Sequence, residues 1–199
     1  MAPMTEPDQP YTQDPRFWRA GAIATSIFMS LVLAALTIDT LRQITPGGPR
    51  VPSYDVINNS VTYEYDSTRA EYVPKIGGEE LIFGHRYSAD EADDLIGKGK
   101  LVIQSRACID CHTFFGNGGY YAPDLTRAWT DPIWMRYPGP RRADKLVKFL
   151  MHPLRLGSRA MPDLNIQRAE AEALVAYLKW MSSVDGNGFP DRFGAVSGQ

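Results

Sequence analysis

An uninterrupted apolar run lies near the amino terminus of the chain. No charged residue occurs from Ala20 to Ile38, and at about 1.5 Å per residue this run spans roughly 28 Å, close to the hydrocarbon thickness of a bilayer. Phe17 and Trp18 at its start are typical of the aromatic belt at a membrane interface. The alternatives are a cleaved signal peptide and a buried core helix, but the run is longer than a usual signal segment and offers only a poor cleavage site. We therefore predict a transmembrane anchor over residues 17–39, after a polar tail at 1–16.

Residues 40–84 form a connector that is rich in proline and glycine, a composition that argues against a long helix. Residues 61–65 alternate apolar or aromatic side chains with polar ones, which indicates a short strand or an extended segment. Two interpretations of this connector stay open: a solvated linker, and a segment packed along a partner subunit.

Three helical patterns follow the connector. Ser88 begins a capping box, which predicts a helix from Ser88 to Ile103, although Gly97 and Gly99 weaken it. A second pattern covers residues 141–151, and a third covers 167–181. In the third, apolar side chains recur at i, i+3, i+4 and i+7 and mark one buried face. The fold class predicted from these patterns is all-α, ending in a mobile tail at 191–199.

Composition narrows the possible partners. The chain has 199 residues, of which 22% are charged, and a formal net charge of -2. Its basic residues are scattered among a slightly larger number of acidic ones, so there is no dense basic stripe to neutralise phosphates. These features argue against nucleic acid as a partner.

The two cysteines of the chain carry its most informative motif. Cys108 and Cys111 are separated by two residues, and His112 follows directly. Such a pair is compatible with a redox dithiol, half of a zinc site or a haem c attachment site. Zinc needs further paired ligands, and the remaining histidines, His85 and His152, are isolated in the sequence. A redox dithiol is expected after a buried strand, not after a helix. We therefore favour haem c, with Cys108 and Cys111 forming thioethers and His112 binding iron axially.

An electron-transfer haem needs a second axial ligand, usually methionine or histidine. Met161 is the best candidate, because it lies in a loop between two predicted helices and a loop can present its sulfur from the opposite face of the haem. Met135 is the second choice, whereas Met151 and Met181 fall on helical patterns. The carbonyl of Pro123 is the expected acceptor for the other ring nitrogen of His112. An open sixth position would instead indicate a haem-based gas sensor.

Several segments resemble the cytochrome c subunit of nitric oxide reductase. The resemblance covers the anchor and most of residues 95–190, and its most specific part is the Tyr-Tyr-Ala-Pro-Asp-Leu run at 120–125. Residues 161–166 and 173–180 also match, as does Val184-Asp185. The connector and the segment from Leu125 to Met161 are longer than that family's pattern, a difference that bears on contacts with a partner and not on the haem chemistry.

The resemblance implies a class I cytochrome c domain, at residues 85–190, that carries one haem. It implies a large membrane subunit with haem b as the partner, in which nitric oxide is reduced to nitrous oxide, so that catalysis belongs to that partner. Electrons would come from a soluble donor such as a cytochrome c or a cupredoxin. The axial pair carries over as His112 and Met161. A calcium ion at the subunit boundary carries over as backbone contacts at Gly118 and Tyr120.

Haem c is attached outside the cytoplasmic membrane, so the expected location is a bacterial inner membrane with residues 1–16 in the cytoplasm and residues 40–199 in the periplasm. Two other roles stay open. One keeps the haem but changes the partner: a subunit of a cbb-type oxidase, or a free anchored electron shuttle. The other is the gas sensor. Copurification of haem b and carbon monoxide binding distinguish these roles.

Overall fold

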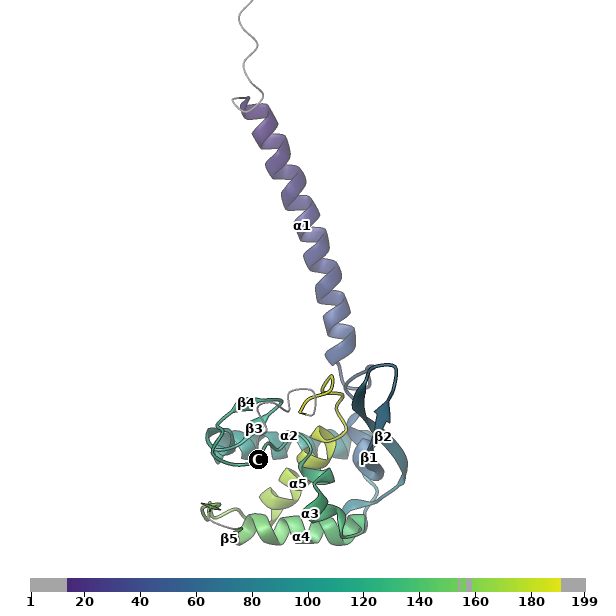
Figure 1. Cartoon of the computed structure of the whole chain (residues 1–199), viewed down its shortest axis with the longest axis vertical. Helices are drawn as coiled ribbons and strands as arrows, with labels where there is room; N and C mark the ends of the chain where they lie inside the picture. Colours follow the sequence, from purple (N-terminus) through teal and green to yellow (C-terminus); the bar gives the residue numbers. More distant parts are fainter. Residues whose placement is uncertain (1–13, 154, 157–158, 191–199) are drawn as a thin grey trace, which may run out of the picture. The chain divides into compact units, whose positions relative to one another are not determined.

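The computed structural model describes residues 14–153, 155–156 and 159–190, and the predicted mobile tail at 191–199 lies outside them. The chain divides into two compact units, residues 1–44 and residues 45–199. Figure 1 labels helices α1 to α5 and strands β1 to β5. Each unit is described by itself.

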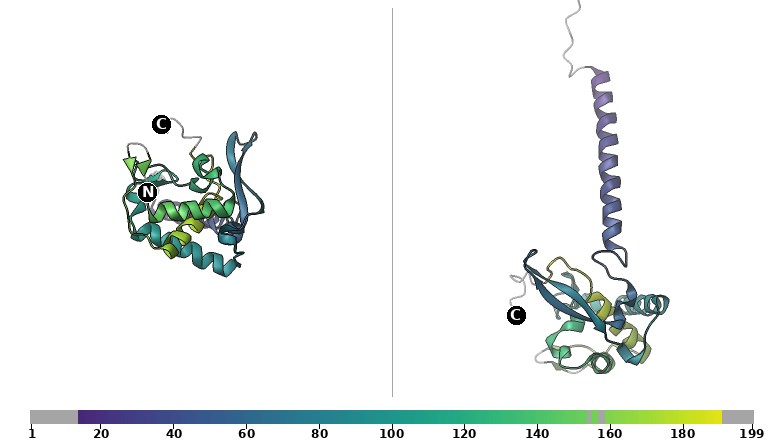
Figure 2. Two further views of the ribbon diagram at one scale, coloured as in Figure 1. Left: turned by 90° about the horizontal axis from the view of Figure 1, so that it is seen from below. Right: turned by 90° about the vertical axis from the view of Figure 1, so that its right-hand side faces the viewer.

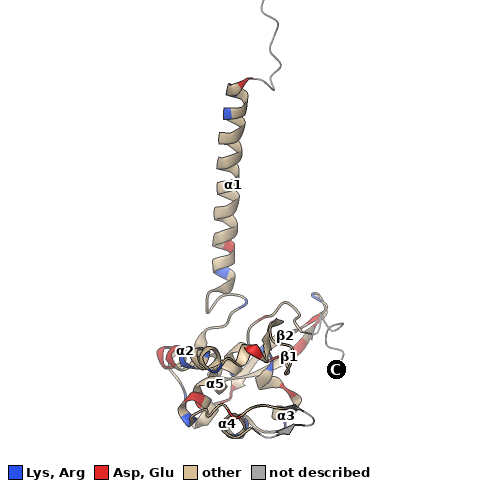
Figure 3. Ribbon diagram, turned by 90° about the vertical axis from the view of Figure 1, so that its left-hand side faces the viewer, with Lys and Arg blue, Asp and Glu red and all other residues tan. Residues whose placement is uncertain are grey.

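The first unit contains helix α1, Pro15–Ile44, which has 30 residues and no buried side chain. The Asp14 side chain accepts the backbone N–H of Arg16 at 2.8 Å and so caps its first turn. Charged residues occur only near the two ends of α1 (Figure 3). Among the described residues, α1 is the one helix long and apolar enough to cross a membrane, and the predicted anchor at 17–39 lies inside it. The helix fits a membrane anchor.

The second unit is mainly helical, which confirms the predicted fold class. Its α-helices are α2 (Ala89–Ser105), α3 (Pro132–Met135), α4 (Gly139–Met151) and α5 (Arg168–Met181). Short 3₁₀ helices are η2 (Tyr54–Asn58), η3 (Ile82–Gly84), η4 (Cys108–Asp110) and η5 (Ala128–Thr130). Antiparallel strand pairs join β1 (Asn59–Asp66) to β2 (Glu71–Glu79), β3 (Thr113–Phe114) to β4 (Asn117–Gly118), and β5 (Arg155–Leu156) to β6 (Arg159–Ala160).

Helices α2 and α5 cross at a glycine. The capping box predicted at Ser88 is present, since its hydroxyl accepts the Glu91 N–H and the Glu91 carboxylate accepts the Ser88 N–H. Gly99, which the sequence marks as a weak point of the helix, packs so closely that an added Cβ would lie 2.2 Å from the Ala173 carbonyl oxygen. The missing side chain at Gly99 therefore permits the crossing, and this contact outweighs its low helix propensity.

The connector is part of this domain. Ile57, Val61 and Ile82 are almost fully buried and belong to the same hydrophobic cluster as Leu174 and Val175 of α5. The short strand predicted at 61–65 is present in β1, and β2 pairs with it so that Val61 lies opposite Ile76. The hairpin formed by β1 and β2 lies along one side of the helices (Figure 2). A solvated linker is therefore the wrong expectation for residues 54–84, because their apolar side chains complete the domain core.

Candidate functional site

A tight turn after α2 presents the three residues of the cysteine motif. Ala107 adopts a left-handed conformation with φ of 51°, which ends the helix and begins η4. The His112 N–H donates to the Cys108 carbonyl at 2.9 Å and closes the turn. Cys108 is buried and Cys111 half-buried, and both are free thiols. Burial raises the pKa of the Cys108 thiol, whereas a reactive redox dithiol needs a lowered one.

The His112 ring is oriented by a backbone carbonyl. Its Nδ1 lies 2.7 Å from the Pro123 oxygen, the acceptor predicted from the sequence. A carbonyl only accepts, so Nδ1 carries the proton, and in the neutral imidazole Nε2 then keeps its lone pair. This is the tautomer that a metal-binding imidazole needs.

The segment that carries Pro123 is braced against the strand that follows His112. The Thr113 hydroxyl donates to the Asp124 carboxylate at 2.6 Å, and the Leu125 N–H donates to the Thr113 carbonyl at 2.8 Å. The Phe115 N–H donates to the buried Thr126 hydroxyl at 2.7 Å. These bonds fix the position of the Pro123 carbonyl relative to the His112 backbone.

Two glycines let the next loop close over the turn. An added Cβ on Gly118, whose φ is 128°, would lie 2.2 Å from the His112 oxygen, and one on Gly119 would lie 2.0 Å from the Asp110 oxygen. Tyr120 is 70% exposed, and its hydroxyl donates to the Gly116 carbonyl at 2.8 Å. Calcium binding at Gly118 and Tyr120 stays a prediction.

The methionine candidates differ in their surroundings. Met161 is partly buried and packs against the hydrophobic cluster that contains Cys108, whereas Met135 is 39% exposed on α3. Met151 also packs against this cluster from the end of α4, and Met181 is buried on α5. Burial therefore favours Met161 over Met135.

Arg106, which the sequence did not single out, holds the loop after Met161. Its guanidinium donates to the Leu164 carbonyl at 3.2 Å and to the Glu170 carboxylate at 2.8 Å. Two hydrogen bonds lower the pKa of the Glu170 carboxyl: the larger effect comes from the Gln167 N–H and the smaller from the Arg106 guanidinium. One arginine next to the cysteine turn thus joins the end of α2, the methionine loop and the first turn of α5.

The donor set fits a covalently attached haem. Two thiols and an imidazole with a free Nε2 lie on one turn, and a partly buried methionine packs against the cluster that contains one of those thiols. Zinc fits less well, because within residues 14–190, so far as they are described, no group of three or more His, Cys, Asp or Glu side chains could hold a metal ion. His85 lies apart on the surface and stacks edge-on against Tyr87.

Comparisons with known proteins identify the type of protein. Residues 96–182 match the family model described as cytochrome c, which implies haem c. The chain is 30% identical over 114 residues to the nitric oxide reductase C subunit of Stutzerimonas stutzeri, covering 56% of this chain and 75% of that protein. It is 29% identical over 124 residues to the corresponding protein of Paracoccus denitrificans, covering 58% of this chain and 81% of that protein. The corresponding protein of Halomonas halodenitrificans is 28% identical over 113 residues, which cover 53% of this chain and 75% of that protein. The chain is therefore an electron-transfer cytochrome and belongs to the family of nitric oxide reductase C subunits.

Proposed function

We propose that this chain is the electron-transfer subunit of a nitric oxide reductase. It would take electrons from a soluble periplasmic donor, such as a cytochrome c or a cupredoxin, and pass them to haem b of a catalytic membrane subunit that reduces nitric oxide to nitrous oxide. The observation that carries the proposal is the His112 ring, held by Pro123 at 2.7 Å with Nε2 free, on a turn that also holds two free thiols.

In this proposal Cys108 and Cys111 attach one haem c by thioethers, and His112 and Met161 bind its iron. Haem c supplies reversible one-electron chemistry when bound. Pro123 holds the proton on Nδ1 and keeps the ring in one orientation, and Arg106 keeps the Met161 loop against α2. Cys108 itself belongs to the buried hydrophobic cluster of the domain. None of these residues transforms a substrate.

A short link between the two units supports a membrane-bound electron acceptor. Six peptide units separate Ile44, the last residue of α1, from Arg50, so they span at most about 21 Å. The Asp185 N–H donates to the Arg50 carbonyl at 2.9 Å, and the Trp180 indole donates to the Pro52 carbonyl at 3.1 Å. A cytochrome on such a link meets acceptors in its own membrane, as a fixed subunit and as an anchored shuttle alike.

The proposed topology places residues 1–16 in the cytoplasm and the domain after the anchor in the periplasm, where haem c is attached. The division into an anchor at 17–39 and a cytochrome domain ending at 190 belongs to the same proposal, with the folded connector added to that domain. A calcium ion at Gly118 and Tyr120, at the boundary with the catalytic subunit, belongs to it as well.

The test is an optical spectrum of the purified membrane complex, oxidised and reduced, with a pyridine haemochrome count of haem c against haem b. Copurifying haem b in excess, together with a near-infrared sulfur-to-iron band, is the expected result. Haem c alone would point to a free shuttle. Carbon monoxide binding to the reduced haem c would support a sensor and contradict Met161 as a ligand.

A further inference from the structure

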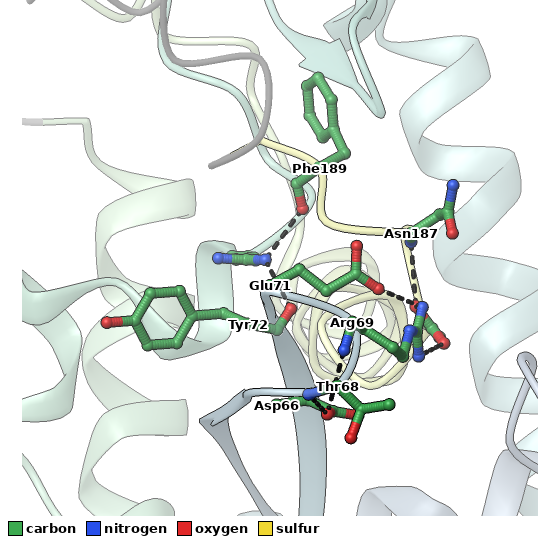
Figure 4. Close-up of polar contacts among 9 residues, drawn as sticks. Asp66, Thr68, Arg69, Glu71, Tyr72, Asn187 and Phe189 are labelled. Carbon is green, nitrogen blue, oxygen red and sulfur yellow. Dashed lines mark hydrogen bonds and ion pairs between the residues drawn. The ribbon is translucent and has the colours of Figure 1, made fainter.

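Arg127 joins three segments that are distant in the sequence. Its guanidinium lies over the Tyr63 ring of β1, with 3.9 Å between the guanidinium carbon and the ring centre. It donates to the Phe189 carbonyl at 2.9 Å and approaches the Tyr72 carbonyl of β2 at 3.4 Å. Figure 4 shows the Tyr72 and Phe189 carbonyls that receive these bonds. Arg127 therefore links its own segment to the hairpin and to residues 185–190, called the carboxyl-terminal segment below.

The hairpin and the carboxyl-terminal segment form a fixed frame for Arg127. Arg69, just before β2, donates two hydrogen bonds to the Asp185 carboxylate, at 2.7 and 3.1 Å, and also pairs with the buried Glu71. The Asn187 N–H donates to the same Asp185 carboxylate at 2.9 Å. These contacts, drawn in Figure 4, hold the hairpin against residues 185–187. A guanidinium bound to both partners has little freedom to move.

On its other side, Arg127 continues directly into the segment that orients His112. Thr126, its immediate neighbour, is buried and accepts the Phe115 N–H, and the Thr126 N–H donates to Asp124 at 2.8 Å. Pro123 precedes Asp124 and accepts from His112. Every residue from Pro123 to Arg127 is therefore held by at least one hydrogen bond, so a continuous hydrogen-bonded segment runs from Arg127 to the Pro123 carbonyl.

We infer that Arg127 is a positioning residue, which uses the β1–β2 hairpin to set the hydrogen bond between Pro123 and His112 and thereby the properties of the haem iron. The inference rests on the proposed function, since it takes His112 as the axial ligand. A stronger bond at Nδ1 makes the imidazole a better electron donor to the metal. Loosening Arg127 weakens that bond, so the oxidised iron is stabilised less and the midpoint potential rises.

The test compares Arg127→Lys with Arg136→Lys in the complete membrane complex. Both changes keep the charge, but lysine lacks the planar fork that stacks on Tyr63 while donating to two carbonyls. Arg136 is exposed at the end of α3 and serves as the matched control. We expect Arg127→Lys to raise the midpoint potential and to shift the electron paramagnetic resonance g-values of the oxidised haem, which report the orientation of the axial ligands. Arg136→Lys should change neither.

A second arm tests the route through the hairpin. Tyr63→Leu removes the ring under Arg127 and should produce a shift in the same direction. The double variant Tyr63→Leu with Arg127→Lys should shift the potential by less than the sum of the two single changes, because both act through one contact. Parent g-values and potential in Arg127→Lys, or full additivity in the double variant, would overturn the inference. Failure of the proposed function is distinct, since the parent complex itself would then lack a methionine-ligated haem c or copurifying haem b.

Discussion

Replacing Glu80 should destabilise the domain far more than replacing its neighbour Glu79. Glu80 lies between two buried cations: its carboxylate is 3.2 Å from the Lys179 ammonium of α5 and 3.6 Å from the Arg142 guanidinium of α4. The Lys179 side chain is fully buried, and both cations also lie over the Trp129 ring. Glu80→Gln keeps the shape of the side chain. It also leaves intact the backbone carbonyl of residue 80, which accepts a hydrogen bond from the Lys179 ammonium at 2.8 Å. The change therefore isolates the loss of the charge.

The size of the effect follows from burial. Removing one partner of a buried ion pair leaves an uncompensated charge and costs about 3–5 kcal/mol of unfolding free energy. Glu79 pairs with Arg86 at the surface, where both side chains are more than half exposed. For such a pair the expected cost of Glu79→Gln is about 1 kcal/mol or less.

The pH dependence provides a second signature. Burial lowers the pKa of Lys179 from 10.5 to about 8, although the charge of Glu80 raises it in part. Below pH 8 the lysine is protonated in the folded and unfolded states alike. Between about pH 8 and 10.5 Lys179 binds its proton more tightly in the unfolded chain, so its contribution to stability rises with pH, by about 3 kcal/mol in all. Glu80→Gln removes the attraction that keeps Lys179 charged, so this rise should begin at a lower pH.

The assay is urea unfolding of the purified full-length holoprotein, followed by circular dichroism at pH 7 and pH 10. The cost of Glu80→Gln should be large at pH 7 and smaller at pH 10, where Lys179 is mostly neutral in the parent as well. The reasoning is refuted by a cost at pH 7 no greater than that of Glu79→Gln, or by a cost that grows toward pH 10.

Three further predictions concern the haem and the carboxyl-terminal segment. Cys111→Ala should remove one thioether, which shifts the pyridine haemochrome band and lowers the yield of holoprotein; a normal band and yield would contradict the attachment. Met161→Ala should lower the midpoint potential and open the reduced iron to carbon monoxide, whereas Met135→Ala should leave both unchanged. The reverse result would assign the ligand to Met135. Asp185→Asn should cost about 1–3 kcal/mol at pH 7, since it weakens the charged bonds to Arg69. Burial alone would raise the pKa of the Asp185 carboxyl, but the bond from Arg69 lowers it below its ordinary 3.8. The stability that this carboxylate contributes is therefore present above pH 3.8 and is lost as the pH falls further. Acid unfolding of the parent and the variant measures this loss.

Local sequence signals predicted helices α1, α2, α4 and α5, though not the short α3, because the causes of these helices are local. The capping bonds of Ser88 join residues three positions apart, and the turn that presents His112 closes between residues four positions apart. The apolar face of α5 repeats at helical spacing and is buried at Leu174 and Leu178. For such features, the residues that interact are also the residues that a sequence pattern compares.

The sequence did not reveal the folded connector or the polar contacts that hold it. Strand β2 contains Pro74, Gly77 and Gly78, which weaken a strand signal, and it forms by pairing with β1, with a register shift between Asn59 and Val61. Lys179 looks like an ordinary charged residue near the end of a helix, yet the group that compensates its charge lies 99 residues earlier. Contacts of this range depend on the assembled fold and leave no periodic trace.

The contrast between local features and long-range contacts also separates the cysteine turn from the folded connector. The proposed haem chemistry uses the turn at Cys108–His112 and Met161, which together make up a small part of the chain. The hairpin lies outside this turn, yet Arg127 connects it to the Pro123 segment, and Arg69 of the hairpin binds Asp185, whose backbone N–H donates to the Arg50 carbonyl. The residues that follow the anchor and the residues that orient His112 therefore belong to one hydrogen-bonded frame. In the proposed complex, a catalytic subunit that moved the hairpin would act on His112, the proposed axial ligand, through Arg127 and Pro123.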